Sequence, residues 1–308
     1  MTPLFTPAGG EASLFRGAWP QEHPNRFEAS DGKENYYEFA ATSQQEGTTV
    51  VDLDGETALR VNLPPIGLNK ARVKIEFERF SSTGAEIDFE VPAVVVIDPG
   101  HGGVGDLPGS DANHAQSPSG VLEKDMTLAY ELALRNSLRE AAVGKKLRLK
   151  IFITRTTDVN VAGAARARTA RDNGADVIFI IHFNSSESHT ARGTLEVRRN
   201  AGNVNQGEDI EFINRVINKV VPAISVYDTG AKKLDHVVVN TAVASDVNLG
   251  NSTNHGIRAG YIEVEFIDNP AIDTLLNLGP NASAVKQAIA DAMRDGIIQD
   301  LKHQPTLP

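Results

Sequence analysis

The chain of 308 residues contains no cysteine. This absence excludes disulfide bonds, thiolate metal ligands and a cysteine nucleophile. It leaves the redox compartment open, because a chain without cysteine suits the cytosol and the exterior alike.

The chain also lacks a long apolar run and an excess of basic residues. Its longest apolar runs, such as Val94–Ile97 and Val177–Ile181, are of strand length, whereas a helix that spans a bilayer needs about 20 apolar residues. The net charge is −10, and residues 1–90 hold 15 of the 40 acidic residues but only 8 of the 30 basic ones. A protein that binds nucleic acid usually carries a basic stripe. We therefore expect neither a membrane span nor a nucleic-acid partner.

Periodicity divides the first third of the chain into two parts. Residues 1–26 are rich in Pro, Gly, Ser and Thr and are expected to form an extended arm. Between residues 27 and 92 apolar and polar residues alternate, as in half-exposed antiparallel strands, and breaks with Gly or Pro separate the runs. A small all-β module is predicted here, with strands at Tyr36–Ala40, Thr49–Leu53, Ala58–Leu63, Ala71–Phe80 and Ala85–Phe89.

Residues 93–303 alternate between strand and helix patterns, which indicates an α/β domain with a mainly parallel central sheet flanked by helices. Its first strand is a continuous apolar run, typical of a strand buried on both faces. Strands are predicted at Ala93–Asp98, Leu149–Thr154, Asp176–His182, Val237–Asn240 and Tyr261–Phe266. Helices are predicted at Lys124–Ala142, Ala162–Asn173, Glu208–Ile224 and Ala282–Lys302.

Four polar side chains lie at the ends of these elements: His101, Glu123, His182 and Glu263. Ligand sites in open α/β sheets form beyond the carboxyl ends of the strands. Two His and one carboxylate are a standard ligand set for catalytic zinc, with water or substrate in the fourth position. A His at a strand end is more often structural, however, and a Glu in a first helical turn is favoured by the helix dipole. The spacing alone leaves both interpretations open.

A series of short motifs runs through this domain in a fixed order. They are IDPGHGG at 97–103, GVLEKD at 120–125, TRTTD at 154–158, an R-x3-A-x4-A-D block at 166–176, IHFNS at 181–185 and E-x-x-F-I-x-N at 263–269. Over about residues 95–300 the chain resembles the zinc-dependent N-acetylmuramoyl-L-alanine amidases, the DPGHGG type of peptidoglycan amidase.

The resemblance implies a zinc metallohydrolase that cuts the amide bond between N-acetylmuramic acid and L-alanine in peptidoglycan. It assigns the Zn²⁺ ligands to His101, Glu123 and His182 and the catalytic carboxylate to Glu263. A metal acidifies its water and polarises a carbonyl, and a carboxylate that is not a ligand then moves the proton to the leaving nitrogen. The implied partner is peptidoglycan, both its glycan strand and its stem peptide.

One departure from the family pattern bears on the catalytic base. The family usually has Gly two residues after the catalytic Glu, where this chain has Glu265. Because side chains alternate along a strand, Glu263 and Glu265 are expected to face the same side. Glu265 is therefore the second candidate for the proton shuttle.

Further polar residues near the motifs receive less specific predictions. His114 is expected to be a solvated loop residue, and His189 is expected at the rim of the site. His255 is expected to flank the late strands, and the alternative is that it lines the substrate groove. By resemblance, Asn184 is expected to orient the site or to bind the peptide.

The alternative function is that of a non-catalytic structural or docking protein that keeps the amidase fold. The β module at 27–92 would then attach it to a protein partner in a larger assembly, such as a phage or injection particle; docking could also accompany catalysis. A peptidase or deacetylase is disfavoured because motifs such as HExxH are absent. The implied substrate lies in the periplasm or cell wall. Since no signal peptide is visible at the N-terminus, phage-type release, injection or a trimmed N-terminus is expected.

Overall fold

The computed structural model describes residues 93–144, 147, 149–199, 206–239 and 257–302, together with the backbone of seven strands between residues 12 and 90. In this part of the chain no helix is both long enough and apolar enough to cross a bilayer.

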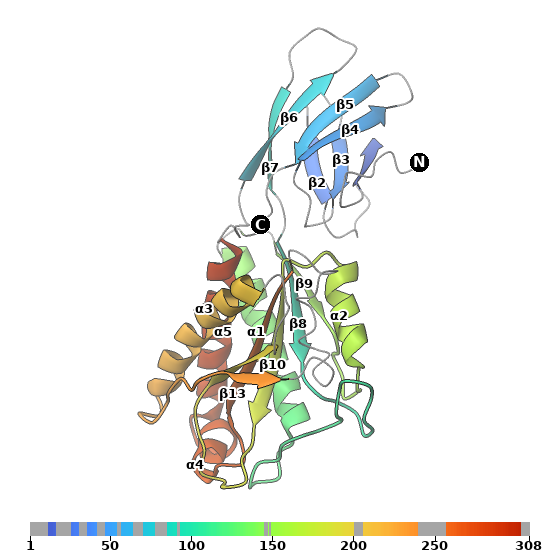
Figure 1. Ribbon diagram of the computed structural model, residues 1–308. Coiled ribbons are helices and arrows are strands. Elements are labelled where there is room, and N and C mark those ends of the chain that lie inside the picture. Colours follow the sequence, from blue (N-terminus) through green and yellow to red (C-terminus); the bar gives the residue numbers. More distant parts are fainter. Residues whose placement is uncertain are drawn as a thin grey trace.

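A six-stranded sheet forms the centre of the α/β domain (Figure 1). Its strand order is β12-β11-β13-β10-β8-β9. The strands are β8 (Ala93–Pro99), β9 (Leu149–Ile153), β10 (Val177–Asn184), β11 (Leu195–Arg199), β12 (Val237–Val239) and β13 (Arg258–Phe266). All neighbouring pairs are parallel except β11 with β13. The mainly parallel sheet predicted from the sequence is confirmed.

Helices cover both faces of this sheet. They are α1 (Glu123–Gly144), α2 (Gly163–Asp172), α3 (Gln206–Ser225) and α5 (Ala282–Leu301), with the short α4 (Pro270–Asp273) running into the π-helix η2 (Thr274–Leu278). Helices α1, α3 and α5 lie together on one side of the sheet, and α2 lies on the other (Figure 1). The four longer helices match the predicted ones to within two residues at each end.

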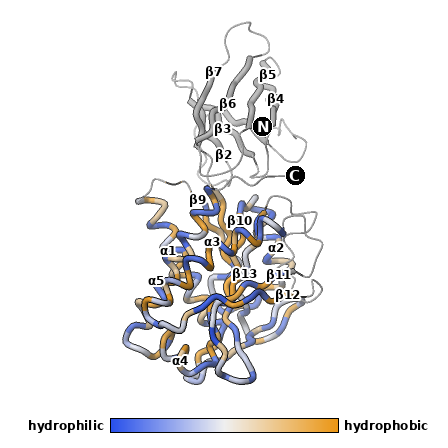
Figure 2. The backbone as a smooth tube through the Cα atoms, turned by 60° about the vertical axis from the view of Figure 1, so that its left-hand side comes forward, coloured by the Kyte–Doolittle hydropathy of each residue, from blue (hydrophilic) through white to orange (hydrophobic). Residues whose placement is uncertain are grey.

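The two faces of the sheet carry separate cores because strand side chains alternate in direction. Val95 and Ile97 of β8 belong to the large cluster with α1, α3 and α5. Val94 and Val96 belong to a smaller cluster on the α2 side. Hydrophobic residues accordingly concentrate along the central strands (Figure 2). A strand that is buried on both faces becomes a rigid support for any residue at its end.

The sequence patterns missed β11, α4 and η2. Strand β11 has only five residues, of which two are arginines, so its pattern was too short to distinguish from a loop. The start of α4 did carry a signal: Asn269 caps the helix by accepting a hydrogen bond from the Ala271 N–H, and Pro270 follows at the first position, as helix starts favour.

The strands before residue 91 form two antiparallel sheets. The first has the order β1-β3-β2, built from β1 (Ala12–Arg16), β2 (Arg26–Ser30) and β3 (Tyr36–Ala41). The second has the order β4-β5-β6-β7, built from β4 (Gly47–Leu53), β5 (Thr57–Leu63), β6 (Lys70–Phe77) and β7 (Ala85–Glu90). Each predicted strand falls on one of these. Strand β1 lies within residues 1–26, where an extended arm was expected, and it pairs with β3.

Candidate metal centre

Three neighbouring strands end side by side at the candidate site. His182 of β10 pairs with Glu263 of β13. On its other side, the Gly100 N–H donates to the Ile181 carbonyl just after β8 ends. Neighbouring residues in a parallel register point to the same face. The imidazole of His182 therefore lies between a glycine and a glutamate, and His101 follows directly in the loop after β8.

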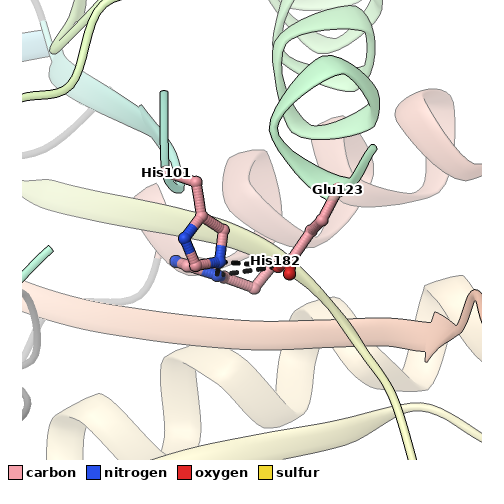
Figure 3. A group of neighbouring side chains, drawn as sticks. All are labelled: His101, Glu123 and His182. Carbon is pink, nitrogen blue, oxygen red and sulfur yellow. Dashed lines mark hydrogen bonds and ion pairs between the residues drawn. The ribbon is translucent and has the colours of Figure 1, made fainter. Parts of the chain in front are cut away.

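The three side chains predicted as metal ligands converge on one point (Figure 3). His101 Nε2 lies 3.1 Å from Glu123 Oε1. His182 Nδ1 lies 3.0 Å from the same oxygen and 3.1 Å from His101 Nε2. All three residues are buried. Among the described residues this is the one group of three or more His, Asp and Glu side chains close enough to share a metal ion.

Backbone contacts fix which ligand atoms face the centre. His101 Nδ1 donates to the Asp111 carbonyl at 2.9 Å, which leaves Nε2 to face the cluster. Glu123 accepts hydrogen bonds from the Phe183 N–H on Oε1 and from the Ala115 N–H on Oε2. Such partners behind the ligands hold them in a binding orientation.

The electrostatics of the cluster favour an ionised carboxylate. Burial raises the pKa of Glu123, but hydrogen bonds from His101 and His182 outweigh that effect, and the pKa falls to about 2. Glu123 is thus a carboxylate at any physiological pH, ready to act as a metal ligand.

The residues fit a tetrahedral metal ion. Zinc binds nitrogen and oxygen ligands at about 2.0–2.2 Å, so a tetrahedral site separates its ligand atoms by about 3.3–3.5 Å. The three observed separations are 3.0–3.1 Å, so a small outward movement of the side chains suffices. Three protein ligands leave the fourth position to water or substrate, which is the composition of a catalytic site.

The loop that presents His101 is held by a buried arginine. His101 has φ +60°, a left-handed conformation that costs about 1–2 kcal/mol in a residue other than glycine. Arg166 of α2 donates to the His101 carbonyl at 2.9 Å, to the Pro99 carbonyl at 2.8 Å and to Asp98 Oδ1 at 2.6 Å. Its guanidinium therefore fixes the backbone on both sides of the turn.

A second group of residues holds the same loop from the α1 side. Arg155 donates to the carbonyls of Pro99, Gly100 and Lys124. Lys124 Nζ donates to the Gly103 carbonyl and to Asp158, whose other oxygen accepts from the Gly103 N–H. These contacts tie His101 to the first turn of α1, where Glu123 lies.

Glu263 lies beside the cluster without belonging to it. Burial raises its pKa to about 8; His182 opposes this rise and Glu123 adds to it. Its Oε2 is buried and has no hydrogen-bond partner within the described ranges. An uncommitted carboxyl oxygen with a pKa near neutrality suits proton transfer.

Glu265 does not share the face of Glu263, contrary to expectation. His182 pairs with Glu263 but Asn184 pairs with Phe266, so β13 contains one extra residue at this point. Such a β-bulge interrupts the alternation of side chains. Glu265 Oε2 accepts a hydrogen bond from the Gly193 N–H at 2.6 Å, so the carboxyl is turned toward β11.

The other polar residues take less central positions. His114 is exposed, as predicted, with its ring parallel to that of His101 at 6.4 Å between centroids. His189 is exposed and contacts Asp268 through Nδ1 at 2.8 Å, apart from the ligand cluster. Asn184 accepts from the Ser185 N–H. His255 lies outside the described residues.

Two arginines and a tyrosine contact the site without having been predicted from the sequence. Arg155 and Arg166 lie inside the quoted motifs, but nothing in a motif tells a buried arginine from an exposed one. Tyr261 lies two residues before Glu263 and stacks on the His182 ring. The sequence feature that could have placed Tyr261 at the site is the alternation of side chains along β13, which puts residues 261 and 263 on one face.

Comparison with known proteins agrees with this geometry. The family model described as N-acetylmuramoyl-L-alanine amidase matches residues 95–297. The probable N-acetylmuramoyl-L-alanine amidase AmiB of Haemophilus influenzae is 29% identical over 201 residues, which are 64% of this chain and 41% of that protein. The N-acetylmuramoyl-L-alanine amidase AmiA of Escherichia coli is 25% identical over 236 residues, 67% of this chain and 75% of that protein.

A solved structure supports the fold. The catalytic domain of CwlV, an N-acetylmuramoyl-L-alanine amidase from Bacillus (Paenibacillus) polymyxa var. colistinus, superposes with a TM-score of 0.51 at 23% identity. The match covers 67% of this chain and 97% of that domain. The chain thus spans less than half the length of the AmiB relative but corresponds to nearly all of an isolated catalytic domain.

Proposed function

The chain belongs to the N-acetylmuramoyl-L-alanine amidase family, and on that premise we propose that it is a zinc-dependent peptidoglycan hydrolase. The proposed reaction is cleavage of the amide bond between N-acetylmuramic acid and L-alanine. The observation that supports it most strongly is the convergence of His101, Glu123 and His182 within 3.0–3.1 Å at the carboxyl ends of the strands, with Glu263 beside them.

The proposed metal ligands are His101 Nε2, His182 Nδ1 and Glu123 Oε1. A zinc ion bound by such a set lowers the pKa of water and polarises a carbonyl oxygen. Two neutral imidazoles and one carboxylate leave such a site with a net positive charge, which favours negative charge that develops on the substrate carbonyl oxygen.

Glu263 is the proposed proton shuttle. It would accept a proton from the attacking water and return it to the amide nitrogen, so that L-alanine leaves as a free amine. Burial, the main cause of its raised pKa, makes the carboxyl able both to take up and to release a proton near neutral pH. The hydrogen bond from Gly193 commits Glu265 elsewhere, so the proposal assigns this step to Glu263 alone.

The proposed substrate lies outside the cytoplasmic membrane, so the proposal includes action in the periplasm or cell wall. Cell-wall lysis in a phage or injection system is one setting that fits this activity. The two sheets of residues 12–90 are proposed to bind a protein partner or a wall component, because the family match begins only at residue 95.

Digestion of muropeptides tests the proposal. The purified protein, with and without a chelator, is incubated with muropeptides, and free stem peptide is detected by mass spectrometry. We expect Glu263→Gln to keep bound zinc and lose hydrolysis, and His182→Ala to lose both. Full activity of Glu263→Gln would remove Glu263 from the mechanism. A wild-type protein that binds zinc but releases no stem peptide would favour the docking alternative.

A further inference from the structure

An aromatic ring lies flat against one of the proposed metal ligands. The rings of Tyr261 and His182 are 4.6 Å apart between centroids and within 13° of parallel. The two residues belong to neighbouring parallel strands, and Tyr261 pairs with Ile180, two residues before His182. The stack is therefore a diagonal contact across the sheet, on the face that carries Glu263.

The opposite flank of the imidazole is closed by backbone. A Cβ placed on Gly100 would lie 2.1 Å from His182 Nε2 and 2.2 Å from Cε1. The ring thus occupies the space that a side chain at position 100 would need. His101 meets it edge-on, with ring centroids 4.6 Å apart and planes at 76°. The His182 ring is enclosed by Tyr261, Gly100 and His101.

The orientation of this ring decides whether it can bind a metal. Nδ1 faces Glu123 Oε1 at 3.0 Å. A half-turn of the imidazole about its Cβ–Cγ bond would put carbon Cδ2 in the place of Nδ1 and remove the ligand atom. Such a turn must pass through the space that the Tyr261 ring fills.

We propose that Tyr261 is a positioning residue that stacks on His182 and holds its Nδ1 toward the metal centre. The proposal rests on the metal site of the proposed function but not on its substrate. Stacked aromatic pairs add stability beyond the area they bury, and partners behind a metal ligand commonly change metal affinity by about 10–100-fold. A flat ring, rather than the tyrosine hydroxyl, is the feature required.

Zinc affinity of the metal-free protein, measured by competition with a chromogenic chelator, tests this role. Tyr261→Phe keeps the ring and should bind zinc within about twofold of the wild type. Tyr261→Leu keeps apolar bulk but loses the flat face, and should bind zinc about tenfold more weakly. Tyr227→Leu is the matched control, because Tyr227 is 38% exposed and lies after α3; its affinity should not change.

Thermal unfolding of the same metal-free proteins, and of Tyr261→Ile as a second apolar replacement, separates a positioning role of Tyr261 from a role in core packing. We expect Tyr261→Leu to remain folded, with its defect confined to zinc binding. Zinc affinity of Tyr261→Leu equal to that of the wild type would overturn the proposal. So would unfolding of both Tyr261→Leu and Tyr261→Ile before zinc is added, because the residue would then be part of the core. A wild-type protein that binds no zinc would instead overturn the proposed function itself.

Discussion

Replacement of Arg166 by Met should destabilise the fold more than any surface change in the same helix. The Arg166 side chain is fully buried and donates five hydrogen bonds, to Val161, Asp98, Pro99, His101 and Ser110. Methionine fills a similar length but donates none. The fully buried carboxylate of Asp98 would lose its ion pair, and three backbone carbonyls, those of Val161, Pro99 and His101, would lose a donor.

The magnitude follows from the burial of the pair. Removing one partner of a buried ion pair costs about 3–5 kcal/mol, because the remaining charge stays buried in the protein interior without a compensating charge. A domain of this size has a total stability of about 5–15 kcal/mol, so the loss is a large share of it. The double variant Asp98→Asn, Arg166→Met removes the stranded charge and should recover part of the loss.

Urea unfolding followed by circular dichroism measures these free energies. The control is Arg168→Met, because Arg168 is an exposed arginine of the same helix; its effect should stay within about 0.5 kcal/mol. A loss below about 1 kcal/mol in Arg166→Met would refute the argument. Strictly additive losses in the double variant would refute the pairing with Asp98.

Three further predictions concern single positions. Gly100→Ala should abolish zinc binding while the fold persists, because the new Cβ would overlap the His182 ring. The zinc content of the purified variant is measured by mass spectrometry, and a zinc content equal to that of the wild type would contradict the prediction. Burial raises the pKa of Asp176 to about 7, above its value in the unfolded chain. The contribution of this carboxyl to the free energy of unfolding should therefore fall as pH rises from about 4 to about 7. Urea unfolding across that pH range should show this fall in the wild type, and Asp176→Asn should lack the part of it that Asp176 causes. Glu265→Gly should keep amidase activity within severalfold of the wild type; an inactive Glu265→Gly with normal zinc content would reopen the assignment of the base to Glu263.

The sequence predicted the core elements well because their signals are local. The continuous apolar run of β8 and the helical period of α1 each lie within one element. Motif order then identified His101, Glu123 and His182 as a set, although they are separated by long stretches of chain. The convergence of His101 and His182 follows because parallel strands end at one edge of a sheet, whereas Glu123 reaches them from the first turn of α1.

Features that depend on contacts between elements could not be predicted. The bulge in β13 is a property of its pairing with β10, and it turned Glu265 away from the expected face. The role of Arg166 depends on α2 packing over the turn after β8. The stack of Tyr261 on His182 depends on the offset between two strands. In each case the residue is visible in the sequence, and its partner becomes apparent only once the chain is folded.

The most direct test of the central claim is to identify the bond that the zinc-loaded protein cuts in purified peptidoglycan. Mass spectrometry and end-group labelling of the products should show stem peptides with a free L-alanine amino terminus and intact glycan strands. The products should be lost with a chelator and restored by added zinc. Cleavage within the glycan or within the stem peptide, or equal cleavage without metal, would contradict the account.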